Sequence, residues 1–224
     1  MESYTFIWMA VAIGALLICA YWAGRKRQRE LSEWAHNHGL NYDKSKCDGV
    51  GLEFADLKCL QRGHSRYAYN VMTGMWQGAA ITAFDYHYAT GHGKNRSDHR
   101  FSAVVILAPL PLQPLLIRRE HFFDKLTEFF GFDDIDFESA EFSRKFYVKA
   151  SDRKWAFDVI HQRMMDYLLS GPNVSVEFGF SAIVAYGSGK FKPSKFSEAA
   201  QFISGIIERF PDYLVRQQEA LAQP

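Results

Sequence analysis

The sequence predicts an α+β protein in which an N-terminal transmembrane helix precedes a mostly antiparallel sheet with packed helices. An uncharged apolar run opens the chain, and stretches rich in Tyr, Val, Ile, Phe and Thr follow it. Helical stretches interrupt these strand-like segments at irregular intervals. Because a doubly wound nucleotide-binding fold requires strands and helices to alternate, the irregular order favours an antiparallel sheet.

The first 24 residues are interpreted as a membrane anchor. Residues 4–23 carry no charged side chain, and as a helix they would be about 30 Å long, which matches the hydrocarbon core of a bilayer. The charges follow this run, whereas a cleaved signal peptide carries them before it. The flanking residues expected at the membrane surface are aromatic or basic: Tyr4, Trp8, Tyr21, Trp22, Arg25, Lys26, Arg27 and Arg29. Since basic flanks stay in the cytoplasm, we expect the N-terminus outside the cell and the body inside.

The composition narrows the function of the body. Of the 224 residues, 48% are hydrophobic, so the chain has the apolar surface that disordered proteins lack. The 26 Lys and Arg residues nearly balance 25 Asp and Glu, which argues against nucleic acid as a partner. Cys19, Cys47 and Cys59 are too few and too widely spaced for a disulfide framework or a CxxC site. In a reducing cytoplasm we expect Cys47 and Cys59 to be free thiols.

Residues 25–38 are predicted to form a juxtamembrane helix, and residues 39–212 the α+β domain. Leu31, Trp34, Ala35 and His38 form an apolar stripe at helical spacing, which Gly39 can end. A short strand begins at Leu40. Three antiparallel strands are expected at 66–72, 79–89 and 100–108, with reversals at 74–78 and 90–95. Three prolines then end this run, and residues 115–117 are expected to form a brief edge strand.

The second half is predicted to mix helices and strands in the same way. The expected elements are a helix at 120–130, a solvated acidic loop at 133–138, a strand at 142–150, a helix at 152–169 with Asp152 as its N-cap, strands at 174–180 and 182–186, and a helix at 194–210. Residues 213–224 are left as a C-terminal tail.

A loose histidine group is the main candidate for chemistry. His87, His92 and His99 lie on or beside the hairpin predicted between residues 79 and 108, with Asp85 nearby. Imidazole and carboxylate side chains can bind zinc or iron, although this spacing matches no standard site, and polar loop residues are the simpler interpretation. The chain contains neither a GxSxG nor a Walker sequence. No catalytic residue and no cofactor is therefore assigned.

Several stretches carry a family resemblance. They are CLQRGHSRYAYNVMTG at 59–74, ITAFDYHYATG at 81–91, FSAVVI at 101–106 and DDIDFESAEFSRKFYVKASDRKWAFDVIHQRMMDYLL at 133–169. Together they resemble a bacterial family of membrane-anchored domains of unknown function. The resemblance implies an opening hydrophobic helix before an α+β body and gives no active site.

The sequence thus predicts a single-pass protein of the bacterial inner membrane. Its bilayer contact is residues 4–23, and its cytoplasmic domain is expected to bind an unidentified protein or to assemble at the membrane. The alternative is a metal-dependent or small-molecule enzyme that uses the region of His87, His92 and His99.

Overall fold

A computed structural model describes residues 2–119 and 135–222, apart from the side chains of 2–7, 10, 219, 221 and 222. The described chain contains an eight-stranded sheet in the order β1-β2-β3-β4-β8-β7-β5-β6, with every neighbouring pair antiparallel. The predicted α+β class is confirmed. The strands are β1 (Asn41–Asp43), β2 (His64–Trp76), β3 (Ala79–Thr90), β4 (Ser97–Leu107), β5 (Leu115–Arg119), β6 (Phe146–Ala150), β7 (Ser175–Phe178) and β8 (Ala182–Tyr186).

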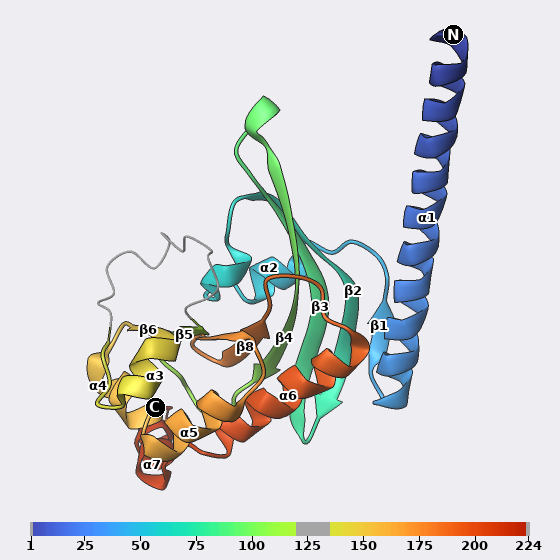
Figure 1. Cartoon of the computed structure of the whole chain (residues 1–224). Coiled ribbons are helices and arrows are strands. Elements are labelled where there is room, and N and C mark those ends of the chain that lie inside the picture. The colour runs from blue at the N-terminus through green and yellow to red at the C-terminus, as the bar shows by residue number, and fades with distance from the viewer. Residues whose placement is uncertain (1, 120–134, 223–224) are drawn as a thin grey trace.

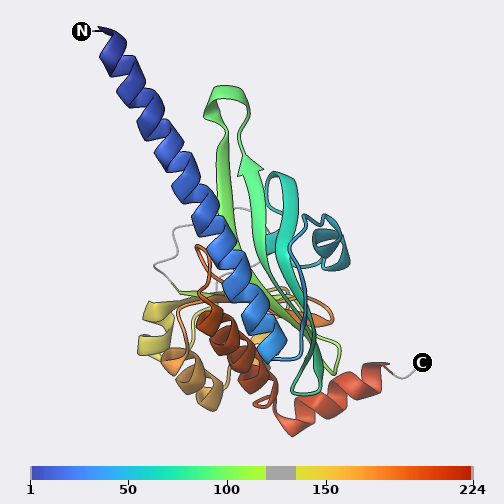
Figure 2. The ribbon, with the colours of Figure 1, turned by 90° about the vertical axis from the view of Figure 1, so that its right-hand side faces the viewer.

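The helices pack against this sheet, with α1 and α6 side by side at the β1–β4 end and α3, α4 and α5 grouped near β5 and β6 (Figures 1 and 2). Two short 3₁₀ turns, η1 (Lys58–Leu60) and η2 (Gly93–Asn95), lie before β2 and at the tip of the β3–β4 hairpin. The α-helices are α1 (Glu2–Asn37), α2 (Gly49–Glu53), α3 (Ala140–Lys145), α4 (Arg153–Val159), α5 (Gln162–Ser170), α6 (Pro193–Ile207) and α7 (Asp212–Ala222).

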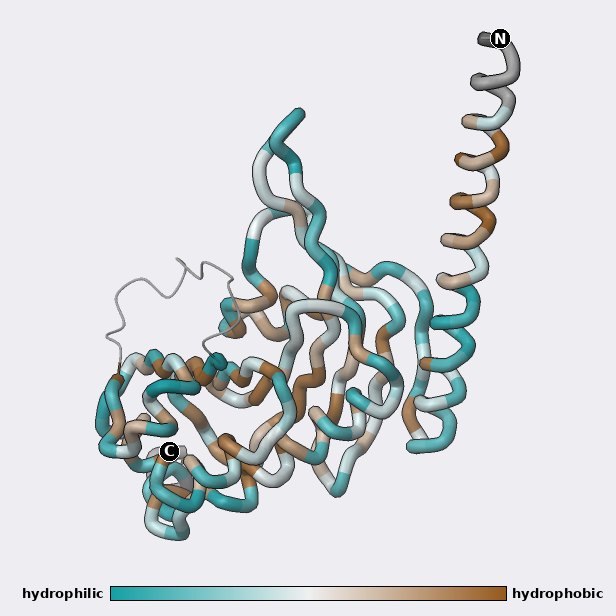
Figure 3. Tube along the Cα trace, viewed as in Figure 1, coloured by the Kyte–Doolittle hydropathy of each residue, from teal (hydrophilic) through white to brown (hydrophobic). Residues whose placement is uncertain are grey.

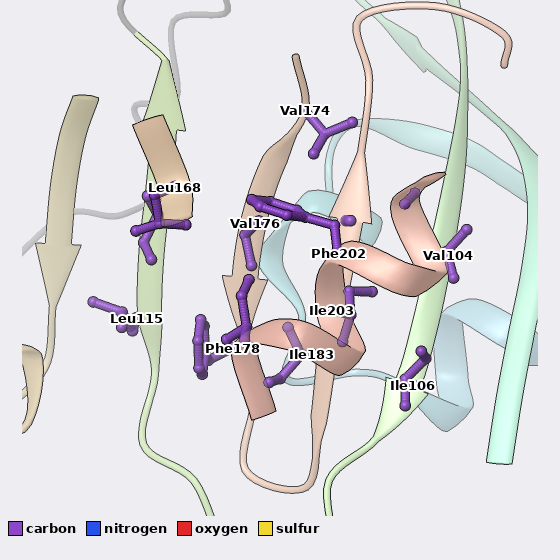
Figure 4. Packing of buried hydrophobic residues seen from close by; sticks show 14 of the residues in the cluster. Val104, Ile106, Leu115, Leu168, Val174, Val176, Phe178, Ile183, Phe202 and Ile203 are labelled. Atoms are coloured by element: carbon purple, nitrogen blue, oxygen red, sulfur yellow. The ribbon is translucent and has the colours of Figure 1, made fainter. Parts of the chain in front are cut away.

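Alternation along the long strands produces a core on each face of the sheet. On one face, Ile81 and Ala83 of β3 join α1 and α6 in the larger cluster, which continues through β5, β7 and β8 (Figure 4). On the other face, Phe84 and Tyr86 pack under the segment that contains α2 and η1. The sheet is therefore covered on both sides where it meets α1.

Helix α1 has two different halves. Its C-terminal part packs on the body through Leu31, Trp34 and Ala35, and Gly39 follows it with a φ of 68°, a conformation that favours glycine. Its N-terminal part extends away from the body and is apolar (Figures 1 and 3). Within the described residues, no helix has an apolar stretch that meets the length and hydropathy of a membrane span.

Some predicted elements differ from the structure. The strand expected at 142–150 is helix α3 followed by β6, because the hydroxyl of Ser139 accepts a hydrogen bond from the backbone N–H of Phe142 and starts a helical turn. Strand β5 is an interior strand rather than an edge strand, since it pairs with both β6 and β7. The helix expected at 120–130 and the start of the acidic loop lie outside the described residues.

The helix predicted over 152–169 is two helices. Asp152 does cap the first one, accepting hydrogen bonds from the backbone of Lys154 and Trp155. The first helix ends at Val159, and α5 begins at Gln162. Between them, the His161 ring lies 3.0 Å from the carbonyl of Arg209. The predicted C-terminal tail is helix α7, which buries Leu214.

Candidate functional site: the junction of α1 with the sheet

The junction centres on Asp85, a fully buried carboxylate in the middle of β3. Arg27 of α1 reaches it with a two-pronged contact, Nε to Oδ2 at 2.8 Å and Nη2 to Oδ1 at 2.6 Å. The third nitrogen of the guanidinium donates to the carbonyl of Phe191 at 2.8 Å. A bidentate pair of this geometry is among the strongest charge-assisted hydrogen bonds in proteins. This contact fixes α1 to the sheet at the position of Arg27 and Asp85.

Neighbouring strands complete the environment of the carboxylate. Ser102 of β4, the register partner of Asp85, donates to Oδ1 at 2.5 Å, and Asn70 of β2 donates to Oδ2 at 2.9 Å. Asn70 has a positive φ of 51° within a register shift of β2, so a bulge turns its side chain toward Asp85. The Tyr42 hydroxyl donates to Asn70, and burial, followed by the charge of Asp85, raises the pKa of Tyr42 to about 12. Every oxygen of the buried carboxylate is thereby satisfied.

Of the residues predicted to flank the membrane, Arg27 has a different role from the one expected. The side chain of Arg27 is 19% exposed and is paired with Asp85, so Arg27 packs as part of the body. Arg25, Lys26 and Arg29 remain exposed, as do Trp8, Tyr21 and Trp22. The side chain of Tyr4 lies outside the described residues.

The structure gives the predicted histidine group separate partners. The His87 ring contacts Asp98 at 2.9 Å and the carbonyl of Ser65 at 3.1 Å. The His99 ring contacts the Thr90 hydroxyl at 2.9 Å. His92 stacks on His64 with ring centroids 4.7 Å apart.

Asp85, the fourth residue of the predicted group, is hydrogen-bonded to Arg27. Among the described residues, no three His, Cys, Asp or Glu side chains are arranged to bind a metal ion.

A second buried polar cluster lies on the opposite face of the sheet. The Glu177 carboxylate of β7 accepts hydrogen bonds from the backbone N–H groups of Lys58 and Cys59, which close the loop before β2 over the core. Burial raises the pKa of Glu177 to about 7 and raises the pKa of the Cys59 thiol. Glu177 is 1% exposed, so its carboxylate is shielded from solvent. We interpret this cluster as structural.

A groove of about 440 Å³ lies at the other end of the long strands. It is formed by the β2–β3 turn, the end of β4 and the C-terminal end of α6, with Trp76, Ile106 and Ile207 among its walls. Glu208 is the one charged residue among those that line the groove. The groove therefore has no cluster of charged side chains that points to a particular ligand or reaction.

Comparison with known proteins gives one result about the fold. A similar solved structure is the crystal structure of the mycobacterial trehalose monomycolate transport factor A, TtfA, with a TM-score of 0.63 and 11% sequence identity. The match covers 84% of this chain and 97% of that chain. The likeness concerns the fold. No family model and no curated protein matches the sequence, so the resemblance to a bacterial family stays a prediction.

The sequence interpretation missed the pairing of Arg27 with Asp85. A signal for it was present, because Asp85 shares a strand face with Ile81 and Ala83, which have the pattern of core residues. A carboxylate on a core face requires a cation or several donors. The partner was hidden by its distance along the chain, since Arg27 lies in another element altogether.

Proposed function

We propose that this protein is a single-pass membrane-anchored protein whose α+β body lies on the cytoplasmic side of a bacterial inner membrane. There it would bind another protein, or assemble, without catalysis of its own. The observation that carries the proposal is the exposed apolar half of α1. Trp8, Leu16 and Leu17 are 71%, 70% and 67% exposed. Continuous apolar surface of this kind is typical of a site that contacts a membrane or a protein.

The distribution of these residues around α1 favours a bilayer over a protein partner. Leu16, Leu17 and Ile18 are consecutive, so they point to different sides of the helix, and all are at least 60% exposed. A partner helix covers one stripe, whereas lipid covers every side. Tyr21 and Trp22 then mark the boundary at which aromatic side chains meet headgroups.

The junction supports a positioning role for the body. Helix α1 runs from its apolar half into its packed half without a linker, and the contact of Arg27 with Asp85 stops the body from turning about it. A domain held in this way would present its partner surface at a set orientation to the membrane. The similar fold of TtfA, a protein named as a transport factor, supports an accessory role over an enzymatic one.

Cell fractionation tests the anchor. The wild-type chain is expected in the membrane pellet and to resist extraction with alkaline carbonate. The double variant Ile13→Arg/Leu16→Arg is expected in the supernatant, since each charge near the centre of a span costs about 3 kcal/mol. Leu52→Arg, at a residue that is 77% exposed on α2, is the matched control and should stay in the pellet. A wild-type chain found in the supernatant would refute the proposal.

A further inference from the structure

The tip of the β3–β4 hairpin extends in the same direction as the apolar half of α1. Both views show the hairpin rising beyond the rest of the body toward the side on which the N-terminus lies (Figures 1 and 2). The tip, residues 91–96, is hydrophilic where the neighbouring half of α1 is apolar (Figure 3). If α1 enters a bilayer, this tip faces the same bilayer.

The contact between Arg27 and Asp85 places these two residues at the same height, so distances along α1 and along β3 can be compared from this point. From Asp85, about eight residues of extended chain lead to the turn at Gly93, a rise of about 26 Å. From Arg27, about four residues of helix lead to the end of the uncharged run at Ala23, a rise of about 6 Å. The tip therefore extends farther than the level at which α1 would enter hydrocarbon.

The charges of the tip are incompatible with hydrocarbon and suited to anionic headgroups. Lys94 and Arg96 are exposed cations at the turn, whereas Arg100 lies farther down β4, opposite His87. The carboxylate of Asp98 lies 3.0 Å from Arg96 and 2.9 Å from the ring of His87. Cations exceed carboxylates here, although the whole chain is nearly neutral at +1. Lys and Arg are expelled from a bilayer core and attracted to an anionic surface.

We propose that the β3–β4 tip is a second membrane contact, which binds anionic lipid headgroups and tilts α1 within the bilayer. The inference rests on the proposed anchor and specifies how the body lies on the membrane. A tilt of α1 moves the tip toward headgroup level, and membrane helices are tilted by about 20° on average, within a range of about 0–40°. The protein then has two contacts with one surface, which defines its orientation.

The test uses the full chain reconstituted in nanodiscs of neutral phosphatidylcholine, with or without anionic phosphatidylglycerol. A fluorophore is attached at Asn95→Cys in a Cys19→Ser/Cys47→Ser background, in which the buried Cys59 stays unlabelled. Quenching by a headgroup-linked quencher is measured. We expect quenching that is stronger with phosphatidylglycerol than without it. The matched control label, Met75→Cys, lies by the turn at the opposite end of β3 and should be unquenched in both lipids.

Charge variants separate lipid binding from mere proximity. Lys94→Gln/Arg96→Gln should lower quenching to its level in neutral lipid, with the contact weakened about fivefold for each cation removed. Lys94→Arg/Arg96→Lys should keep it. Equal quenching in both lipids, or wild-type quenching in the Lys94→Gln/Arg96→Gln variant, would overturn the hairpin contact while leaving the anchor in place. A wild-type chain that fails to enter nanodiscs would instead overturn the anchor, and the hairpin contact with it.

Discussion

Asp85 shows how one buried charge can determine the geometry of a junction. Its carboxylate is fully buried and accepts from Arg27, Asn70 and Ser102, which belong to α1, β2 and β4. Removing one partner of a buried pair costs about 3–5 kcal/mol, because the other charge stays buried without compensation.

We expect Asp85→Asn and Arg27→Met each to lower the free energy of unfolding of the full chain in detergent by about 3 kcal/mol or more. The double variant should lose less than the sum, since it leaves no uncompensated charge. Chemical unfolding followed by near-UV circular dichroism measures all four proteins of this cycle. Strictly additive losses would mean that the two side chains are not coupled.

Glu177 gives the fold a dependence on pH. Burial raises its folded pKa to about 7, above the ordinary value of 4.5. The folded chain therefore holds this proton more tightly than the unfolded chain. The stability gained is fully present below about pH 4.5 and is lost as the pH rises through about 7.

Glu177→Gln removes this titration. Between about pH 5 and pH 8 the wild-type chain should lose about 2 kcal/mol more of its unfolding free energy than the variant does. Urea unfolding of both proteins at the two pH values gives the difference. An identical pH dependence in the two proteins would show that Glu177 is ionised in the fold throughout this range.

At the scale of elements, the sequence predicted best where the pattern is local. The long hairpin strands have the period of two and the turn residues that define them, so β3 at Ala79–Thr90 lies where it was expected. Shorter elements depended on particular contacts. The break between α4 and α5 falls where His161 contacts the carbonyl of Arg209, and the position of β5 inside the sheet depends on β6 and β7, both of which come later in the chain.

The basic residues after the apolar run also divide into one that is held by a particular contact and others that are exposed. Arg27 is engaged by Asp85, whereas Arg25, Lys26 and Arg29 are exposed at the level where α1 leaves the body. In the proposed topology, these exposed cations are the ones available to retain the flank in the cytoplasm. Two roles that look alike in the sequence therefore belong to different residues.

Topology reporters test this division. Arg25→Gln/Lys26→Gln/Arg29→Gln should export a fraction of the C-terminal reporter, while Arg27→Gln should leave the topology unchanged and lower the melting temperature. A periplasmic alkaline phosphatase and a cytoplasmic fluorescent reporter, fused in turn to the C-terminus, measure the two orientations. Export of the wild-type fusion would contradict the inside orientation of the body.

For the whole molecule, the boundary between the proposed anchor and the body falls inside a single helix. Residues 25–37 of α1 contribute Arg27, Leu31, Trp34 and Ala35 to the body, and the indole of Trp34 also donates to Ser197 of α6 at 2.9 Å. Among the residues before them whose side chains the structure describes, none belongs to either core cluster. Separating membrane attachment from folding therefore requires a cut within α1.

Two truncations test this boundary. Residues 25–224 should be water-soluble and keep the melting temperature of the full chain, because the core is complete. Residues 38–224 should fail to fold, since losing Leu31 and Trp34 costs about 2–3 kcal/mol each and Asp85 is left unpaired at a further cost of about 3–5 kcal/mol. That sum is comparable with the entire stability of a typical domain, about 5–15 kcal/mol. Size-exclusion chromatography and thermal circular dichroism distinguish the two fragments, and a folded, monomeric 38–224 would show that α1 is an attachment to the body rather than part of it.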